Sequence, residues 1–194
     1  MYVSDLRHFF DVPDDAPGPA RRMAEHLTSV VRAATAGDAG ARWVSALRCR
    51  RRPGHRACPG HIAVRRTDVP ASIEWACTCC SDEGVISGWE GSPFDLRQRR
   101  PEAGRAGGHG VVISPEVSDT LRGLVLLDTA CERLVFRAKA SEEGVVLTGD
   151  DDELDELIGY VAAEANHGED RRRQKRLDAA FAVLSDAFAQ AQRL

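Results

Sequence analysis

Five of the six cysteines fall within 32 residues, between Cys49 and Cys80. They stand beside turn-forming residues (RRPGHRACPG and TCCSDEG) and not on apolar stripes. In a reducing compartment, clustered cysteines bind a metal more often than they form disulfides. The sixth, Cys131, is isolated on an apolar stretch, which is typical of a buried core residue. The distribution therefore predicts one metal-bound module.

Short β-forming stretches surround these cysteines. Between residues 43 and 89 the stretches WVSALRC, HIAVRR, SIEWAC and GVISGW alternate with turn-rich segments, which predicts an antiparallel β module of about four strands. Cys49 and Cys77 would end the outgoing strands, and Cys58 and Cys80 would precede the return strands. Two facing hairpins of this kind would bring four thiolates to tetrahedral distance from one ion, as a structural zinc site requires.

The motifs C-x8-C (Cys49 and Cys58) and C-x2-C (Cys77 and Cys80) make residues 41–95 resemble the zinc-ribbon group of folds. The second motif is typical, whereas the first departs from the usual spacing of about two to four residues. The resemblance implies a non-catalytic zinc ion, because a closed four-ligand site has no open position for water or substrate.

The long first spacing leaves the ligand set open. Cys58-Pro59-Gly60-His61 is itself a C-x2-H motif, so His61 is an alternative to Cys49. Cys79, inside the second motif, is another candidate. Hairpin symmetry favours Cys49, because His61 would begin a return strand.

The rest of the chain predicts an α+β fold. After Pro19 the apolar residues follow a helical spacing that stops at Gly37. We expect four parts in chain order: an N-terminal helical segment (1–40), the zinc-ribbon-like β module (41–95), a Gly-rich linker (96–110), and an α+β unit that ends in a helix pair (111–194).

Within the C-terminal unit, helix starts are marked by local signals. Ser114 precedes Pro115, and Asp150 and Glu153 match a capping box. The apolar residues after Ser114, as far as Val125, predict one buried helical face. Residues 133–138 predict a strand of a hairpin around the sequence SEEG.

The last predicted helix follows Gly168 and pairs with the preceding helix. Its expected buried side chains are Leu177, Phe181, Leu184 and Phe188. It opens on the basic run 171–176, where cations oppose the helix dipole. Either the run is a solvated surface or it meets a partner anion.

Charge is distributed unevenly. Residues 1–110 carry a net charge of +3 and residues 111–194 a net charge of −7. Seven arginines surround the first cysteine motif: Arg48, Arg50, Arg51, Arg52, Arg56, Arg65 and Arg66. Together with the three tryptophans of the β module they suggest phosphate contacts and base stacking on nucleic acid. The alternative is a solvated basic loop, with the tryptophans packed in the β core.

No catalytic triad order, phosphate-binding loop, dinucleotide fingerprint or H-E-x-x-H motif is present. We therefore expect a non-catalytic intracellular zinc-binding protein whose basic surface meets nucleic acid or a protein partner. Two alternatives stay open. One is an enzyme, or enzyme subunit, with its site in the C-terminal unit. The other is a self-assembling structural protein, a homo-oligomer that forms through the last helices.

The start of the chain, MYVSDLRHFFDVP, does not resemble a targeting signal, and no apolar run reaches the length of about 18 residues that a membrane helix needs. We expect a cytoplasmic protein without membrane contact. The 24 Arg against 2 Lys suggest a GC-rich bacterial genome.

Overall fold

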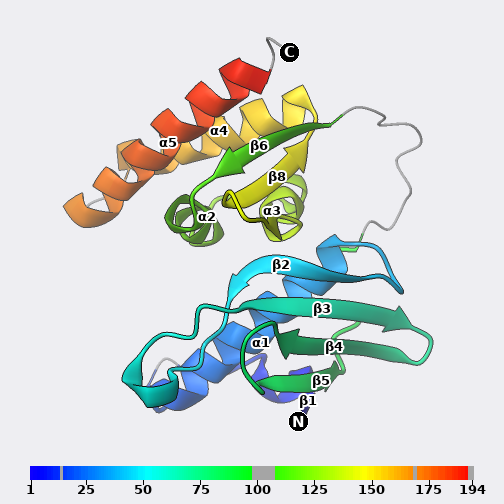
Figure 1. The fold of residues 1–194 in the computed structure, drawn as a ribbon. Coiled ribbons are helices and arrows are strands. Elements are labelled where there is room, and N and C mark those ends of the chain that lie inside the picture. Colours follow the sequence, from blue (N-terminus) through cyan, green and yellow to red (C-terminus); the bar gives the residue numbers. More distant parts are fainter. Residues whose placement is uncertain (14, 98–107, 168–169, 192–194) are drawn as a thin grey trace. The chain divides into compact units, whose positions relative to one another are not determined.

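The computed structural model describes residues 1–13, 15–97, 108–167 and 170–191 (Figure 1). The chain divides into two compact units, Met1–Gln98 (unit 1) and Arg99–Leu194 (unit 2). The described ranges hold five α-helices and eight strands, and most strand pairs are antiparallel, which confirms the predicted α+β class. None of the described helices is both long and apolar enough to cross a membrane. Most of the expected linker falls on residues 98–107, outside the described residues.

Unit 1 is built on a five-stranded sheet. In sheet order the strands are β1 (Tyr2–Asp5), β5 (Glu83–Ser87), β4 (Ala71–Cys77), β3 (His61–Asp68) and β2 (Arg42–Arg48). The strands from β2 to β5 form an antiparallel meander, in agreement with the alternating sequence pattern. β1 pairs parallel to β5, and the sequence pattern did not indicate it. Two short 3-10 helices, η1 (Leu6–Phe9) and η2 (Pro53–His55), complete the unit.

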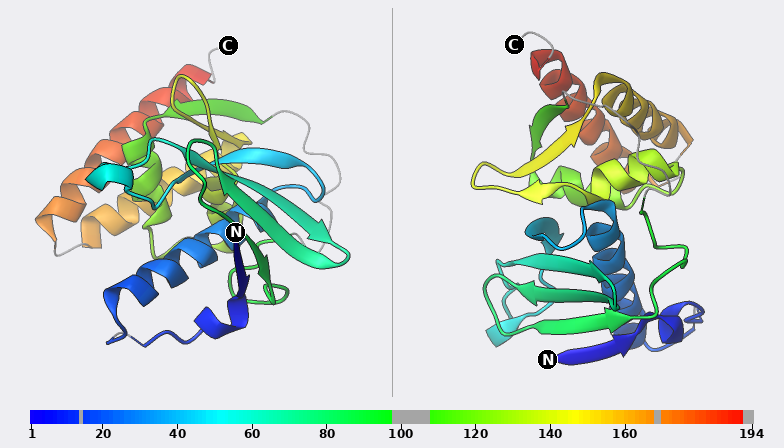
Figure 2. Two further views of the ribbon diagram at one scale, coloured as in Figure 1. Left: turned by 60° about the horizontal axis from the view of Figure 1, so that its bottom comes forward. Right: turned by 90° about the vertical axis from the view of Figure 1, so that its right-hand side faces the viewer.

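Helix α1 (Gly18–Ala36) covers one face of this sheet (Figure 2). Pro19 stands in its first turn, where a backbone N–H would have no partner within the helix. The N–H that proline lacks is therefore not needed there. Its largest fully buried side chains are Leu27, Val30 and Val31. At its other end, the buried guanidinium of Arg66 donates to three carbonyl oxygens, those of Ala34, Thr35 and Gly37 (3.1, 3.2 and 2.8 Å). Arg66 therefore satisfies carbonyls that the end of a helix leaves unpaired.

Unit 2 combines a three-stranded antiparallel sheet with four helices. The sheet order is β7 (Lys139–Ala140), β8 (Val145–Gly149) and β6 (His109–Ile113). The helices are α2 (Pro115–Arg122), α3 (Thr129–Phe136), α4 (Asp151–His167) and α5 (Arg171–Ala191). Both predicted helix starts are confirmed. Ser114 Oγ accepts from Val117 N (3.3 Å), and Asp150 and Glu153 bond reciprocally (2.8 and 3.2 Å).

The chain from Arg133 to Phe136 is helical, so the strand predicted over residues 133–138 is wrong. Asp128 caps α3 by accepting from the backbone N–H of Cys131 (2.8 Å). On this side of β8 only Lys139 and Ala140 of the described chain after α3 pair with it, so the hairpin around SEEG keeps a very short first strand. The apolar run suits either structure, and the aspartate cap favours the helix.

α4 and α5 form the expected antiparallel helix pair (Figure 1). Their fully buried side chains are Leu154, Leu157, Val161, Leu177, Ala180 and Leu184. Phe181, expected in this core, is 40% exposed, because Leu177, Ala180 and Leu184 already supply the stripe that faces α4. Val125, expected on the buried face of α2, is 75% exposed, because α2 ends at Arg122.

Candidate metal centre

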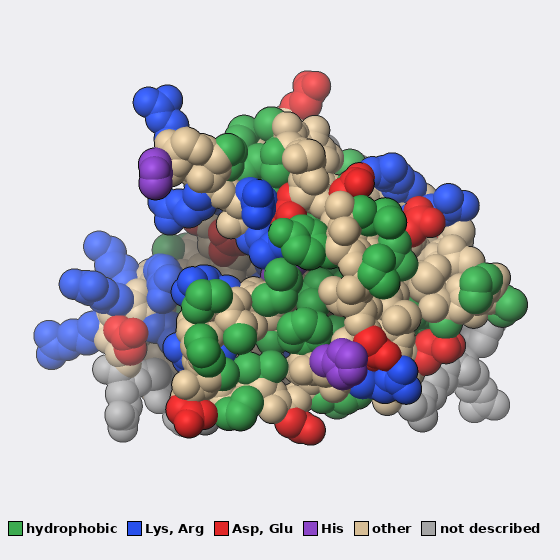
Figure 3. All heavy atoms as spheres, turned by 90° about the horizontal axis from the view of Figure 1, so that it is seen from below, with side chains coloured by type: hydrophobic (Ala, Val, Ile, Leu, Met, Phe, Trp, Pro, Cys, Tyr) green, Lys and Arg blue, Asp and Glu red, His purple; other side chains and the backbone are tan. Residues whose placement is uncertain are grey.

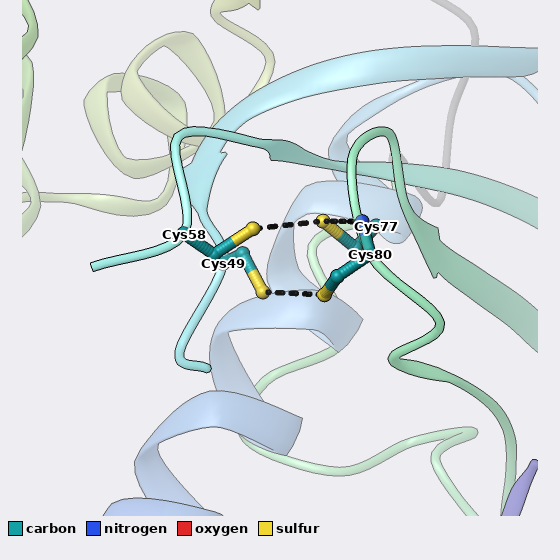
Figure 4. Close-up of side chains that lie close together, drawn as sticks. All are labelled: Cys49, Cys58, Cys77 and Cys80. Atoms are coloured by element: carbon teal, nitrogen blue, oxygen red, sulfur yellow. Dashed lines mark hydrogen bonds between the residues drawn. The ribbon is translucent and has the colours of Figure 1, made fainter. Parts of the chain in front are cut away.

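The cysteines converge at one end of the unit 1 sheet because that sheet is a meander. β2 and β4 run toward this end, and β3 and β5 start from it. Cys49 follows β2, Cys58 precedes β3, Cys77 ends β4 and Cys80 precedes β5. Residues far apart in the sequence therefore meet (Figure 4).

The four sulfur atoms lie within 4.8 Å of one another. The Sγ–Sγ distance is 3.6 Å for Cys49 and Cys80, and 3.7 Å for Cys58 and Cys77. All four thiols are free, and a disulfide would need a distance of about 2.05 Å. Zinc–sulfur bonds of about 2.3 Å in a tetrahedron place the sulfurs about 3.8 Å apart. The spacing is therefore compatible with a four-thiolate metal site.

Main-chain hydrogen bonds shape the first cysteine loop. Cys49 N donates to Gly60 O (2.8 Å), and Cys58 N donates to Arg51 O (2.9 Å). The N–H of Arg51 also points at Cys49 Sγ (3.4 Å). The first loop is therefore fixed by a main-chain hydrogen bond at each of its two cysteines, although eight residues separate them.

The second cysteine loop is tighter. Cys77 N donates to Asp82 O (2.8 Å), and the N–H groups of Cys79 and Cys80 both point at Cys77 Sγ (3.3 and 3.4 Å). A sulfur that accepts backbone N–H groups is stabilised as a thiolate. The thiolate is the form that binds a metal.

Gly60 lets the two loops approach each other. A Cβ atom at Gly60 would lie 2.5 Å from Cys77 Sγ and 2.7 Å from Cys79 Cβ. Any other residue would push the loops apart, because side-chain carbons do not pack that closely. The Pro59-Gly60 pair therefore has a packing reason beyond turn formation.

Electrostatics also fit a bound cation. Burial raises the pKa of the Cys49 thiol. Burial would raise the pKa of Cys77 as well, but the backbone N–H groups of Cys79 and Cys80 outweigh it and lower that pKa. Four thiolates at these distances repel one another, so a cation is needed to hold all of them ionised. Four soft sulfur donors suit a zinc-type ion.

The described side chains that are close enough to share one ion are the four cysteines, without His61 or Cys79. His61 begins β3, and its main chain joins the two loops: it accepts from Thr78 N (2.9 Å) and donates to Thr78 Oγ1 (3.0 Å). Cys79 is exposed.

A buried ion pair lies beside the cysteines, and the sequence did not reveal it. Arg50 Nε lies 3.2 Å from Asp82 Oδ2, and the Asp82 side chain is fully buried. Arg50 also stacks over Tyr2, 5.2 Å from the ring centre. Since Arg50 follows Cys49 and Asp82 follows Cys80, the pair connects the two loops. The only sequence signal was an aspartate two residues after a cysteine.

The seven arginines singled out above divide into two groups. Arg66 is buried against α1, Arg50 pairs with Asp82, and Arg65 donates to Gly40 O (3.2 Å). Arg48 also has a partner. Arg51, Arg52 and Arg56 form the other group: they are exposed, and no described side chain pairs with them.

These three arginines lie on the loop between β2 and β3, where residues 51–57 are all exposed. Gly54 and His55 adopt positive φ (58° and 65°), so the loop turns sharply at η2. Figure 3 shows basic side chains (blue) projecting from the surface at the upper left of the view. We refer to residues 51–57 as the basic loop.

Two of the three tryptophans are buried and offer no surface for base stacking. Trp75 and Trp89 are 3% and 0% exposed. Trp43 is half-buried against Gly37, where a Cβ would lie 2.8 Å from its Nε1. The alternative in which the tryptophans pack the β core is therefore confirmed for Trp75 and Trp89.

In comparisons with protein families, with curated proteins and with solved structures, no match to this chain is found.

Proposed function

We propose that this is a non-catalytic nucleic-acid-binding protein in which one structural zinc ion is held by Cys49, Cys58, Cys77 and Cys80. The single observation that carries the zinc assignment is the approach of four free thiol sulfurs to within 4.8 Å of one another. The two motifs and the meander together support a zinc-ribbon-like module. Because four thiolates fill a tetrahedral zinc, the ion would stabilise the fold and leave no position for substrate.

The ion would also fix the basic loop, because the loop runs between the ligands Cys49 and Cys58. Exposed arginines without a protein partner are suited to phosphate, which guanidinium binds through paired N–H donors. Arg51, Arg52 and Arg56 meet this description. Affinity would come from the phosphate backbone, since Trp75 and Trp89 are buried and Trp43 is half-buried.

Free clustered thiols are maintained in reducing compartments. We therefore place the protein in the cytoplasm as part of the same proposal.

The test is the salt dependence of binding to fluorescent DNA and RNA oligonucleotides. In Arg51→Gln/Arg52→Gln, the slope of log affinity against log salt should fall by about two units for duplex DNA, because each phosphate contact contributes about 0.9. Arg21→Gln/Arg22→Gln is the matched control: both residues are exposed on α1, and the net charge changes equally. Chelation of the metal should also abolish binding through the loop.

An unchanged slope in the loop variant, or equal losses in the loop variant and its control, would contradict the proposal. So would a wild-type protein that binds neither DNA nor RNA at low salt.

A further inference from the structure

The first two turns of α5 carry a surface that the metal centre does not explain. Arg171, Arg172, Lys175 and Arg176 are all exposed. Their spacing (i, i+1, i+4, i+5) places them on one side of the helix. We call these four residues the basic face of α5.

Arg173, in the middle of the same run, points the other way and has a structural role. It donates to Gly123 O (2.9 Å) and forms an ion pair with the buried carboxylate of Glu164, which also accepts from Val125 N (3.0 Å). Arg173 thus ties α5 to α4 and to the loop after α2. No described side chain pairs with any residue of the basic face.

The position of the basic face works against helix stability. Cations in the first turn of a helix oppose its dipole. Asp170 offsets part of this by accepting from Arg172 N and Arg173 N (2.8 and 3.4 Å). Four further cations at this place add nothing to the packing of unit 2.

We propose that the basic face of α5 is a second nucleic-acid contact surface, which binds backbone phosphates. This inference rests on the proposed function, because it adds a second contact to the same ligand. It requires no fixed placement of the two units relative to each other.

The net charge of −7 over residues 111–194 does not prevent such contacts, because the longest acidic run lies away from the basic face. The acidic run Asp150–Glu156 lies at the start of α4, and α5 runs antiparallel to α4 (Figure 1). The 17 residues of α4 extend about 25 Å. This is about three Debye lengths at physiological ionic strength. A phosphate at the basic face is therefore largely screened from the acidic end.

A nucleic acid suits this face better than a membrane surface does. A helix that lies on a bilayer inserts its apolar side among the lipids. The apolar side of α5, with Leu177, Ala180 and Leu184, is already buried. Along its exposed side, Asp178 and Asp186 interrupt any apolar stripe.

The experiment uses the full-length protein and the same oligonucleotides. In Arg171→Gln/Arg172→Gln, the loss of affinity between 50 and 200 mM salt should be about tenfold smaller than in wild type, because about two phosphate contacts disappear. Glutamine keeps the helix propensity, and a thermal melt checks that unit 2 remains folded. Arg21→Gln/Arg22→Gln again serves as the control for net charge.

The loop variant separates the two proposals. If only Arg51→Gln/Arg52→Gln weakens binding, the proposed function stands, and the proposal that the basic face of α5 binds phosphates is overturned. If only Arg171→Gln/Arg172→Gln weakens binding, the basic face of α5 is a contact surface, and the proposed role of the basic loop is overturned. Equal losses in all three variants would overturn both surfaces, because net charge alone would then explain binding. Capture by anionic phosphatidylserine vesicles, with no oligonucleotide binding, would overturn the nucleic-acid assignment.

Discussion

The two units organise their loops and helix ends by different means. In unit 2, each of the four helices begins at a side chain that accepts from the first turn: Ser114, Asp128, Asp150 and Asp170. In unit 1, α1 has no side-chain cap, and the end of the sheet is held by cysteines from both halves of the meander. Order at the starts of the unit 2 helices is therefore encoded locally, whereas order at the cysteine end of unit 1 depends on distant residues and, in the proposed function, on an ion.

The largest expected effect is a selective loss of unit 1 structure when the metal is removed. Structural zinc contributes about 10–16 kcal/mol of apparent binding free energy in small zinc peptides, which is as large as the whole unfolding free energy of a typical domain. After chelation, hydrogen exchange should accelerate throughout β2 to β5 and stay slow in the α4–α5 core. Equal acceleration in both units, or none in unit 1, would break the contrast.

His26 offers a smaller effect that is again confined to unit 1. Its ring packs edge-on against Trp75, with 4.9 Å between the ring centres. Burial, followed by the charge of Arg50, lowers the pKa of His26 from 6.5 to about 4, while Asp82 acts in the opposite direction. The unfolded chain binds the proton first, so stability falls as pH drops from about 6.5 toward 4. The full loss of unfolding free energy is about 3 kcal/mol, because each pKa unit corresponds to about 1.4 kcal/mol.

Metal release at low pH affects wild type and variant alike, so the measurement is a comparison of two proteins. The unfolding free energy of wild type and of His26→Phe is measured at pH 7 and pH 4.5. The wild type should lose more than the variant does. Parallel losses would show that His26 does not contribute to the pH dependence.

Replacing one glycine in each unit by alanine should change stability in opposite directions. Gly60→Ala should destabilise unit 1 by about 1–3 kcal/mol and weaken metal retention, because the new methyl group meets Cys77 Sγ at 2.5 Å. Gly159→Ala in α4 should stabilise unit 2 by about 0.5–1 kcal/mol, because nothing lies within 4 Å and alanine favours the helix. Chemical denaturation followed for each unit checks both, and a neutral Gly60→Ala would show that the loops are not tightly packed.

The same contrast governs what could be predicted from the sequence. The four meander strands and the starts of α2 and α4 follow from local patterns, and so does the cysteine cluster, since each cysteine borders a strand. β1 was missed because its pairing with β5 joins residues about eighty positions apart, which no local pattern encodes. The helix α3 was missed because Asp128 was not recognised as a cap.

Side-chain partners were the least predictable part of the candidate site. Arg66 and Arg51 are alike in sequence, yet Arg66 is buried against the carbonyl end of α1 and Arg51 is exposed on the basic loop. The ion pair between Arg50 and Asp82 and the role of Gly60 depend on the approach of two loops. Such contacts become visible only once the chain is folded.

The fourth ligand can be tested by a pair of substitutions. His61→Ala should retain the metal, because His61 lies outside the group of side chains that can share one ion. Cys49→Ala should lose the metal, because it removes one of the four sulfurs. The measurement is the metal content of each purified variant. The reverse result would show that His61, and not Cys49, is the fourth ligand.

The most direct test of the central claim is the mass of the intact protein under native and denaturing conditions. The two masses should differ by one zinc atom in wild type and in Cys79→Ser, whose exposed thiol lies outside the cluster. In Cys80→Ser the difference should disappear. A wild-type chain that carries no metal after purification under reducing conditions, or a Cys80→Ser variant with a full zinc atom, would contradict the four-cysteine centre.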